Sequence, residues 1–374
     1  MRNLFGMHKG LPKTPTKKID KYIEIVGSSK PRLNAMSRDS QLTMLEVLGA
    51  QYTKVAITLV DNMADLKMLV AKKPDLVVLG MKLVLLDSSK SYDDSPKVWL
   101  SSYLSEHNIS FTGSDTNALN LEFDKHEAKQ KVIDAGLQSS AYFIARIDQP
   151  LPKHKLTFPL FVKPTNRGDS KGIDERSVVH SDLELELKIR SIHSELSSDA
   201  LIEEYLPGRE FSVAVIRRPV SSDLLAMPIE ITAPADRKGN TFLSEAVKQA
   251  DSEKVVVIQN PALKNALNTL AIGVFEALGS RDYGRIDMRL DAFGNPSFIE
   301  ANLMPGLSDH GYLSRCFYVN ERITYSDMIL SIVSLGLERA MHLSAKALIS
   351  APSDFDEAAV SYPEVSRRSA APIA

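Results

Sequence analysis

Apolar and polar positions follow two alternating periods along the first third of the chain. Short apolar runs with the length of buried strands stand at 22–26, 55–59, 76–79 and 109–112. Helical spacing of apolar side chains appears between them, at 40–48, 62–72 and 96–107. Strands that alternate with helices predict a mostly parallel sheet with right-handed crossovers, ending near residue 120. The polar stretch 82–96 is expected to be a loop.

The pattern changes after residue 120, where helices and strands no longer alternate one by one. Helices are predicted at 124–136, 181–197, 261–279 and 325–343. Strands are predicted at 141–144, 158–163, 200–204, 211–216, 224–231 and on both sides of a turn at 291–296. The stretch 236–240 reads as a mobile loop and 350–374 as a loose tail. This part of the chain is therefore expected to be α+β.

The turn at 291–296 is expected to bring candidate site residues together, because Gly294 and Asn295 predict a hairpin there. A hairpin sets residues before the turn opposite residues after it, so Asp287 should face Glu300, with Asn302 just beyond. Single acidic residues on strands are usually solvated. Three oxygen ligands on neighbouring strands instead suit Mg²⁺, and Arg285 lies on the same face as Asp287.

A second candidate site is the loop 165–172, which follows the apolar strand that ends at Lys163. Gly168, Gly172 and small polar residues allow backbone N–H groups to approach an anion closely. Alone, such a loop is as typical of an ordinary surface hairpin as of a phosphate site. The preceding Val-Lys-Pro strand makes a phosphate site the better interpretation.

Composition excludes several classes of function. The 374 residues are 44% hydrophobic and 25% charged, with a formal charge of −2, which gives no electrostatic case for nucleic acid or an anionic membrane as partner. The single cysteine, Cys316, excludes an intrachain disulfide and a cysteine-based zinc site. No apolar run reaches the length of a spanning helix, and no apolar core follows the basic first 18 residues. We expect a cytoplasmic enzyme.

At this point the sequence resembles the ATP-grasp superfamily, and more narrowly the D-alanine–D-alanine ligases. Their last metal-binding hairpin carries G-R-x-D and E-x-N-x-x-P-G, which residues 284–287 and 300–306 match. The family's D-K-x-x-x-K run matches residues 124–129, and its remaining motifs match Lys163 with its loop and residues 203–210, in the same order. The resemblance covers residues from about 120 to about 340.

The resemblance implies a fold and a division of the chain. The fold class is α/β, with an N-terminal parallel-sheet domain, called preATP-grasp in the family, before a two-lobed α+β ATP-grasp domain. The expected parts are an N-terminal domain at 1–120, a central lobe with the phosphate loop at 121–206, a C-terminal lobe with the metal hairpin at 207–345, and a tail at 346–374.

It also implies roles for individual residues. ATP would be held by Lys125, Lys163, Gly168, Ser170, Glu203, Glu204, Tyr205, Leu206 and Glu210. Within this set the lysines contact phosphates, Glu203 meets the adenine amino group, and Glu210 holds the ribose hydroxyls. Mg²⁺, or Mn²⁺, would bind Asp287, Glu300 and Asn302, and Arg285 would be catalytic. Substrate contacts are expected from Asp169, Lys238, Gly306 and His310.

The departures from the family concern the substrate. Residues 27–32 lack the family's Glu for an ammonium group, residues 236–250 contain no Tyr, and Gly311 replaces a Ser. Asp169-Ser170 replaces two adjacent serines in the phosphate loop. Lys30 and Arg32 are candidates for new contacts.

The resulting hypothesis is an ATP-dependent carboxylate–amine ligase that works through an acyl phosphate and releases ADP and phosphate. Its partners would be a small-molecule carboxylate and an amine, such as amino acids or short peptides, and a homodimer is left open. The alternatives are a true D-alanine–D-alanine ligase with an unusual pocket, another amide ligase of secondary metabolism, a carboxylase subunit, and an inactive ATP-binding regulator. The complete charged set argues against the regulator.

Overall fold

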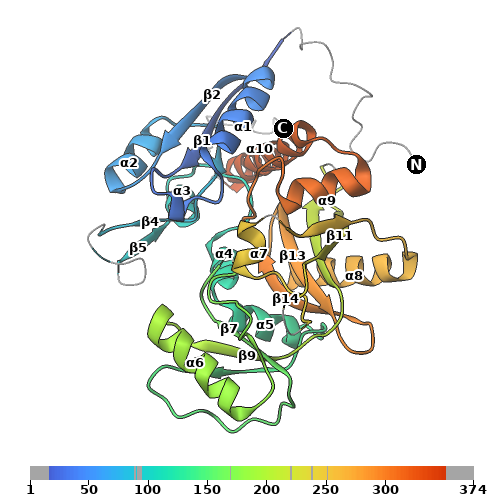
Figure 1. Ribbon diagram of the computed structural model, residues 1–374. Helices are drawn as coiled ribbons and strands as arrows, with labels where there is room; N and C mark the ends of the chain where they lie inside the picture. Colours follow the sequence, from blue (N-terminus) through green and yellow to red (C-terminus); the bar gives the residue numbers. More distant parts are fainter. Residues whose placement is uncertain are drawn as a thin grey trace, which may run out of the picture.

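The structure is a computed structural model that describes residues 17–87, 90, 95–168, 170–219, 221–236, 239–250 and 252–350. Figure 1 shows an N-terminal sheet, a central sheet and a smaller sheet at the opposite end of the molecule. The mixed α/β fold class is confirmed, with one parallel sheet and three antiparallel ones in the described residues. The four-part domain division stays a prediction.

The N-terminal sheet is parallel, as the alternating pattern predicts. Its middle strand β1 (Ile19–Gly27) lies between β2 (Tyr52–Leu59) and β3 (Leu76–Leu79). The crossover helices are α1 (Arg38–Gln51) and α2 (Met63–Ala71). Ser37 and Asn62 cap them by accepting hydrogen bonds from the first-turn N–H groups.

Three predictions in this region were wrong. The segment predicted as a helix from residue 96 begins as β5 (Lys97–Trp99), and the helix α3 (Leu100–Glu106) starts later. A partner strand, β4 (Leu83–Leu85), forms inside the predicted loop and pairs with β5. The predicted strand 109–112 is reduced to a single bridge between Val77 and Phe111.

The smaller sheet is antiparallel, in the order β6-β9-β7-β8. Its strands are β6 (Tyr142–Ala145), β7 (Leu160–Pro164), β8 (Val178–Val179) and β9 (Ala200–Glu204). The helix α6 (Asp182–Leu196) covers it with Leu185, Ile189 and Ile192, which are buried against Leu160 and Ile202. Before this sheet come α4 (Thr116–Phe123), which was not predicted, and α5 (Lys125–Asp134).

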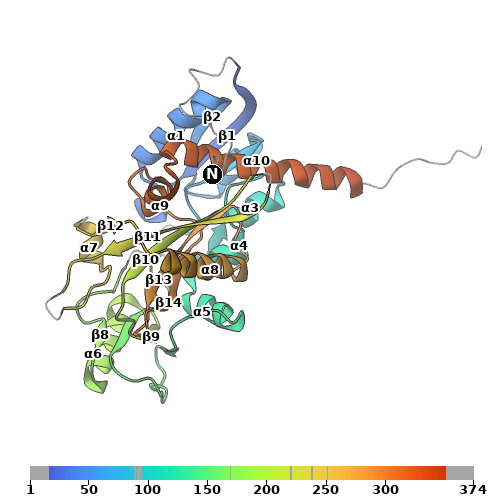
Figure 2. The same ribbon diagram turned by 90° about the vertical axis from the view of Figure 1, so that its right-hand side faces the viewer.

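The central sheet runs β12-β11-β10-β13-β14. Its strands are β10 (Glu210–Arg217), β11 (Leu224–Thr232), β12 (Lys254–Val256), β13 (Tyr283–Leu290) and β14 (Pro296–Asn302). The helices α8 (Pro261–Ala277) and α9 (Tyr312–Glu321) cover opposite faces of β10 and β11 (Figure 2). Side chains of β10 alternate accordingly: Val213 packs into the α8 core, and Ala214 into the α9 core. A short helix, α7 (Glu245–Gln249), precedes β12.

The last described helix returns the chain to the N-terminal sheet. Figure 2 shows α10 (Tyr325–Ser350) beside α1, and it extends past the predicted start of the tail at 346. Arg339 of α10 pairs with Asp282 and donates to the Phe111 carbonyl. Asp282 in turn accepts from the Gly113 N–H at 2.7 Å. The end of the N-terminal part is thus bonded to the residue before β13. No helix in the described part of the chain has the length and apolar character to cross a membrane.

Candidate active site

The hairpin of β13 and β14 brings together the residues expected at the metal site. Asp287 pairs with Glu300 and Arg285 pairs with Asn302, as the turn at 291–296 predicts. An irregularity in register follows Asp287, so the remaining pairs beyond it are shifted by one residue. All four side chains are partly buried. The pairing is confirmed, and the roles assigned to these residues stay predictions.

Asp287 is held from three sides. Arg285 donates from Nε and Nη2 to its two carboxylate oxygens at 2.9 and 2.8 Å, a two-pronged charge-assisted pair. Asn302 Nδ2 donates at 3.0 Å and Ser212 Oγ at 2.6 Å. Because Asn302 uses its amide nitrogen here, its carbonyl oxygen is left to face a ligand. Burial lowers the pKa of Arg285, but Asp287 outweighs this effect and raises the pKa above its ordinary value.

Glu300 lies among cations. Burial raises its pKa, but Lys125, Lys248, Lys163 and Arg285 together lower that pKa to about 2. Lys125 Nζ lies 4.0 Å from Glu300 Oε2, and the described residues give this carboxylate no hydrogen bond. An ionised carboxylate with open lone pairs beside Asp287 and Asn302 is a hard oxygen donor set. It therefore fits Mg²⁺.

Two predicted phosphate lysines lie near Glu300 in buried surroundings. Lys125 donates to the Arg167 carbonyl at 2.5 Å, and desolvation lowers its pKa. Lys163 Nζ lies 2.8 Å from Glu203 Oε2. The second oxygen of Glu203 lies 2.7 Å from Lys129 Nζ, which the sequence did not single out as a site residue. Both oxygens of Glu203 thus already contact a lysine, and an adenine amino group would have to share them.

A pocket lies between the four-stranded and the five-stranded antiparallel sheets. It is lined by ten of the predicted residues, Lys125, Lys163, Ser170, Glu203, Glu204, Tyr205, Leu206, Glu210, Asp287 and Glu300. Arg289 also lines it and donates to Glu210 at 3.2 Å. Burial raises the pKa of Glu210 to about 7, although Arg289 acts in the opposite direction.

Two loops meet over this pocket. Ser170 of the phosphate loop donates a hydrogen bond to the Leu243 carbonyl at 2.8 Å. The ring of Phe242 packs edge-on against the ring of Phe161, with 5.7 Å between the ring centroids. Lys248 of α7 follows, and it lines both this pocket and a larger cleft beside it. The predicted substrate residues Asp169 and Lys238 belong to the same two loops but lie outside the described residues.

The larger cleft opens from Glu300 towards the N-terminal sheet. Predicted residues on its wall are Arg285, Asn302, Gly168, Gly306 and His310, together with Lys30 and Arg32. The cleft and the pocket share Lys125, Arg167, Lys171, Lys248 and Glu300. A molecule in the cleft would therefore meet a nucleotide in the pocket at the metal hairpin.

A family model described as "D-ala D-ala ligase C-terminus" matches residues 145–334, which is more than half of the chain. The chain belongs to the D-alanine–D-alanine ligase family. It is therefore an ATP-grasp enzyme that joins a carboxylate to an amine, using ATP and Mg²⁺. The match spans the metal hairpin and most of the pocket, but Lys125, Ser140 and the N-terminal wall of the cleft lie before it.

Relatives and solved structures agree with this membership. An uncharacterised protein of Sinorhizobium fredii is 30% identical over 238 residues, covering 62% of this chain and 67% of its own. A D-alanine–D-alanine ligase of Hydrogenovibrio crunogenus is 29% identical over 231 residues, covering 61% and 70%. The structure of a D-alanine–D-alanine ligase from Bacillus anthracis complexed with ATP covers 86% of this chain and 99% of that one, with 21% identity and a TM-score of 0.67. This last likeness shows the fold.

Several residues of the ligase site were missed from the sequence. They are Lys129, Phe242, Lys248, Glu253, Arg289 and Tyr312. Lys129 is the last residue of the D-K-x-x-x-K run, so its position one helical turn after Lys125 was a usable signal. Lys248 and Glu253 lie in a stretch whose short elements carry no periodic pattern.

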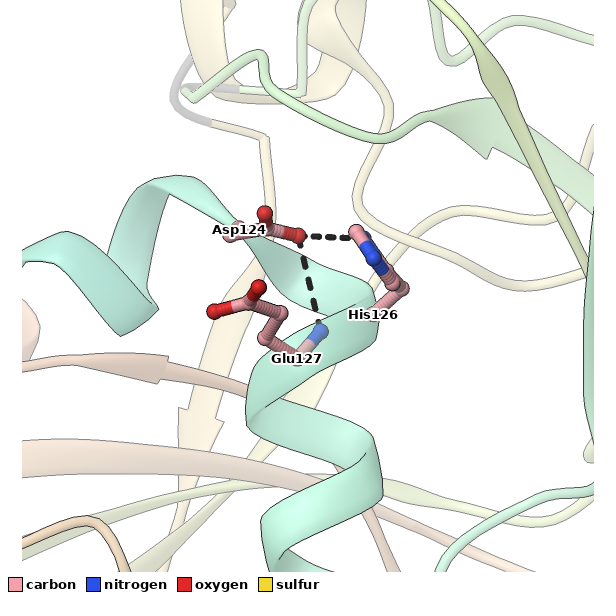
Figure 3. Close-up of side chains that lie close together, drawn as sticks. All are labelled: Asp124, His126 and Glu127. Carbon is pink, nitrogen blue, oxygen red and sulfur yellow. Dashed lines mark hydrogen bonds and ion pairs between the residues drawn. The ribbon is translucent and has the colours of Figure 1, made fainter. Parts of the chain in front are cut away.

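One acidic cluster of the ligase lies apart from the hairpin. Asp124, His126 and Glu127 have ligand atoms within 4.8 Å of one another (Figure 3). Asp124 is the N-cap of α5 and accepts from the Glu127 N–H at 3.4 Å, and it also pairs with His126. Capping accounts for this cluster, so we assign it no metal.

Proposed function

We propose that this ligase converts a carboxylate to an acyl phosphate with ATP and then joins it to an amine, with best activity on an acid other than D-alanine. The observation that carries the proposal is that Arg285, Asp287 and Glu300 lie together. They lie between a pocket lined by the residues predicted to hold ATP and a cleft whose wall departs from the family. The reaction class rests on family membership, and the acyl phosphate, the residue roles and the substrate are inferred.

In this proposal the pocket residues hold ATP. Lys125 and Lys163 neutralise phosphate oxygens, and Glu210 accepts hydrogen bonds from the ribose hydroxyls. Bound Mg²⁺ would supply charge neutralisation on the phosphates, held by Asp287, Glu300 and Asn302. Phosphoryl transfer needs little covalent help from a protein, so positioning and electrostatics supply most of the rate.

Arg285 has the central role among the residues of the chain. The substrate carboxylate attacks the γ-phosphorus, and the bond to the β,γ-bridging oxygen breaks as ADP leaves. The guanidinium of Arg285, fixed by Asp287, faces the negative charge of the transferring phosphoryl group. It next faces the oxyanion that forms when the amine adds to the acyl carbon. The two loops that meet at Ser170 and Leu243 exclude water, which protects the acyl phosphate from hydrolysis.

The cleft favours an acid with more negative charge than alanine. Its lining contains ten lysine and arginine residues against four glutamates. Lys30, Arg32 and Arg315 lie on this wall in addition to the cations around the phosphates. A cleft lined by one sign of charge attracts ligands of the other sign. A dicarboxylic acid or an acidic amino acid is therefore the proposed acyl donor.

Hydroxylamine trapping tests the mechanism and the substrate together. With ATP, Mg²⁺ and hydroxylamine in place of the amine, a panel of carboxylic acids should give a hydroxamate and ADP, because hydroxylamine captures acyl phosphates. We expect kcat/KM for dicarboxylates or acidic amino acids to exceed that for D-alanine. Formation of AMP and pyrophosphate would contradict the mechanism, and D-alanine as the best acid would contradict the substrate assignment.

ATP affinity should depend on pH through Glu210. The ionised carboxylate is the stronger acceptor for ribose hydroxyls, and its pKa is about 7 in the free protein. Lowering the pH through that value protonates Glu210, so the KM for ATP should rise about tenfold from pH 8 to pH 6. The measurement is the steady-state KM for ATP across this pH range in the parent protein and in the Glu210→Gln variant. The variant lacks the titrating carboxylate, so its pH profile gives the contribution of ATP protonation alone. Equal pH profiles of the KM for ATP in the two proteins would contradict the assignment of Glu210 to ribose binding.

A further inference from the structure

Glu253 lines the cleft, and one of its carboxylate oxygens is buried with no hydrogen-bond partner among the described residues. The residue lies between α7 and β12, on the cleft wall. Its Oε1 accepts a hydrogen bond of 2.5 Å from the Tyr312 hydroxyl. Its Oε2 is buried and has no hydrogen-bond partner among the described residues. Leaving a buried charged oxygen unpaired costs free energy. We therefore expect a hydrogen-bond donor from a ligand to bind at this oxygen.

Tyr312 connects this carboxylate to the reaction centre. It is the first residue of α9, and its ring lies 5.3 Å from the Arg285 guanidinium. Arg285 is bonded to Asp287, so a single side chain separates Glu253 from the metal hairpin. Burial, followed by the bond to Glu253, raises the pKa of Tyr312 well above its ordinary value. The phenol therefore stays a hydrogen donor and fixes the orientation of the carboxylate.

We propose that Glu253 binds the ammonium group of the amine substrate and takes the proton that must leave before the amine attacks. The inference rests on the proposed acyl phosphate, since the amine reacts only after that intermediate forms. The ligase needs such a residue, because an amine that enters as an ammonium ion must lose a proton before its nitrogen can attack. An ammonium N–H donor also satisfies Oε2, the atom that otherwise lacks a partner.

One N–H proton passes from the ammonium group to Glu253 Oε2, which leaves a nitrogen lone pair. The lone pair forms the C–N bond at the acyl carbon, and the carbonyl oxygen takes the negative charge beside Arg285. The C–O bond to phosphate then breaks and phosphate leaves with the electron pair. A second N–H proton is lost to the departing phosphate, and the neutral amide remains.

The test compares two nucleophiles in a Glu253→Gln variant. Hydroxylamine is uncharged near neutral pH and needs no proton removed before it attacks, whereas an amino acid enters as an ammonium ion. We expect ligation of an amino acid to fall about 100-fold, the scale of losing a general base, with hydroxamate formation within about twofold of the parent protein. Tyr312→Phe, which keeps the ring and removes the bond to Oε1, should raise the KM for the amine and leave hydroxamate formation intact.

Glu186→Gln is the matched control, because Glu186 is an exposed acid on α6 that lines neither the pocket nor the cleft. It should change neither reaction. Equal losses with both nucleophiles in Glu253→Gln, or no loss with either, would overturn the role of Glu253. Absence of hydroxamate from the parent protein would instead refute the acyl phosphate, and the amine step would fall with it.

Discussion

Replacing Glu300 with Gln should lower kcat at least about 100-fold, the scale of removing one preorganised electrostatic group. Gln keeps the shape of the side chain but removes the negative charge that faces the metal. The loss is large because Glu300 is ionised and surrounded by Lys125, Lys163, Lys248 and Arg285, as its pKa of about 2 indicates. In the variant these cations would repel Mg²⁺ without compensation. The measurement is ADP release at a series of Mg²⁺ concentrations.

A matched variant makes this result specific. Glu276→Gln makes the same chemical change at an exposed position on α8, which covers the other side of the sheet. It should leave both kcat and the Mg²⁺ requirement unchanged. Near-normal turnover of Glu300→Gln at limiting Mg²⁺ would defeat the metal assignment.

Arg285→Lys is the second substitution with a large expected effect. Lysine keeps the charge but cannot reproduce the planar fork that binds both oxygens of Asp287 at 2.9 and 2.8 Å. The charge would then move away from the transferring phosphoryl group. We expect kcat to fall about 100-fold or more, as for the loss of one oxyanion donor, with little change in the KM for ATP.

Thermal melting separates catalysis from folding in this variant. Arg285 and Asp287 are both partly buried, so a folding defect would lower the melting temperature together with the activity. Arg190→Lys on α6, where the side chain is 75% exposed, is the control for the Arg-to-Lys change. An unchanged kcat with a raised KM for ATP would assign Arg285 to nucleotide binding alone.

The parts of the site that the sequence predicts are those fixed by local rules. The hairpin of β13 and β14 follows from Gly294 and Asn295, and the pairing of Asp287 with Glu300 follows from the hairpin. Lys163 was found because an apolar strand delivers it to a glycine-containing loop. In each case the decisive neighbours lie within about 15 residues of each other, so period and turn chemistry are sufficient.

The missed features depend on distant contacts. Glu253 and Tyr312 bond across 59 positions, and neither residue has a local pattern that points to the other. The strand β5 replaces the start of a predicted helix because β4 is present to pair with it, and tertiary pairing outweighs local propensity there. Glu203 shows a third kind of limit: resemblance placed it at the adenine, but only the structure reveals the two lysines that hold it.

The bonds at Asp282 constrain how this enzyme can change its substrate. Asp282 joins residues 111–113 to the strand that carries Arg285, and the Ala35 N–H donates to Gly80 at 2.8 Å, which ties the segment with Lys30 and Arg32 to the N-terminal sheet. The cleft wall and the metal hairpin are therefore each bonded to the N-terminal part of the chain. We propose that substitutions at positions 30 and 32 alter the preferred acid, because both residues line the cleft and neither lines the nucleotide pocket. Under this proposal the choice of acid can change through the N-terminal wall of the cleft without a change in the residues that line the nucleotide pocket.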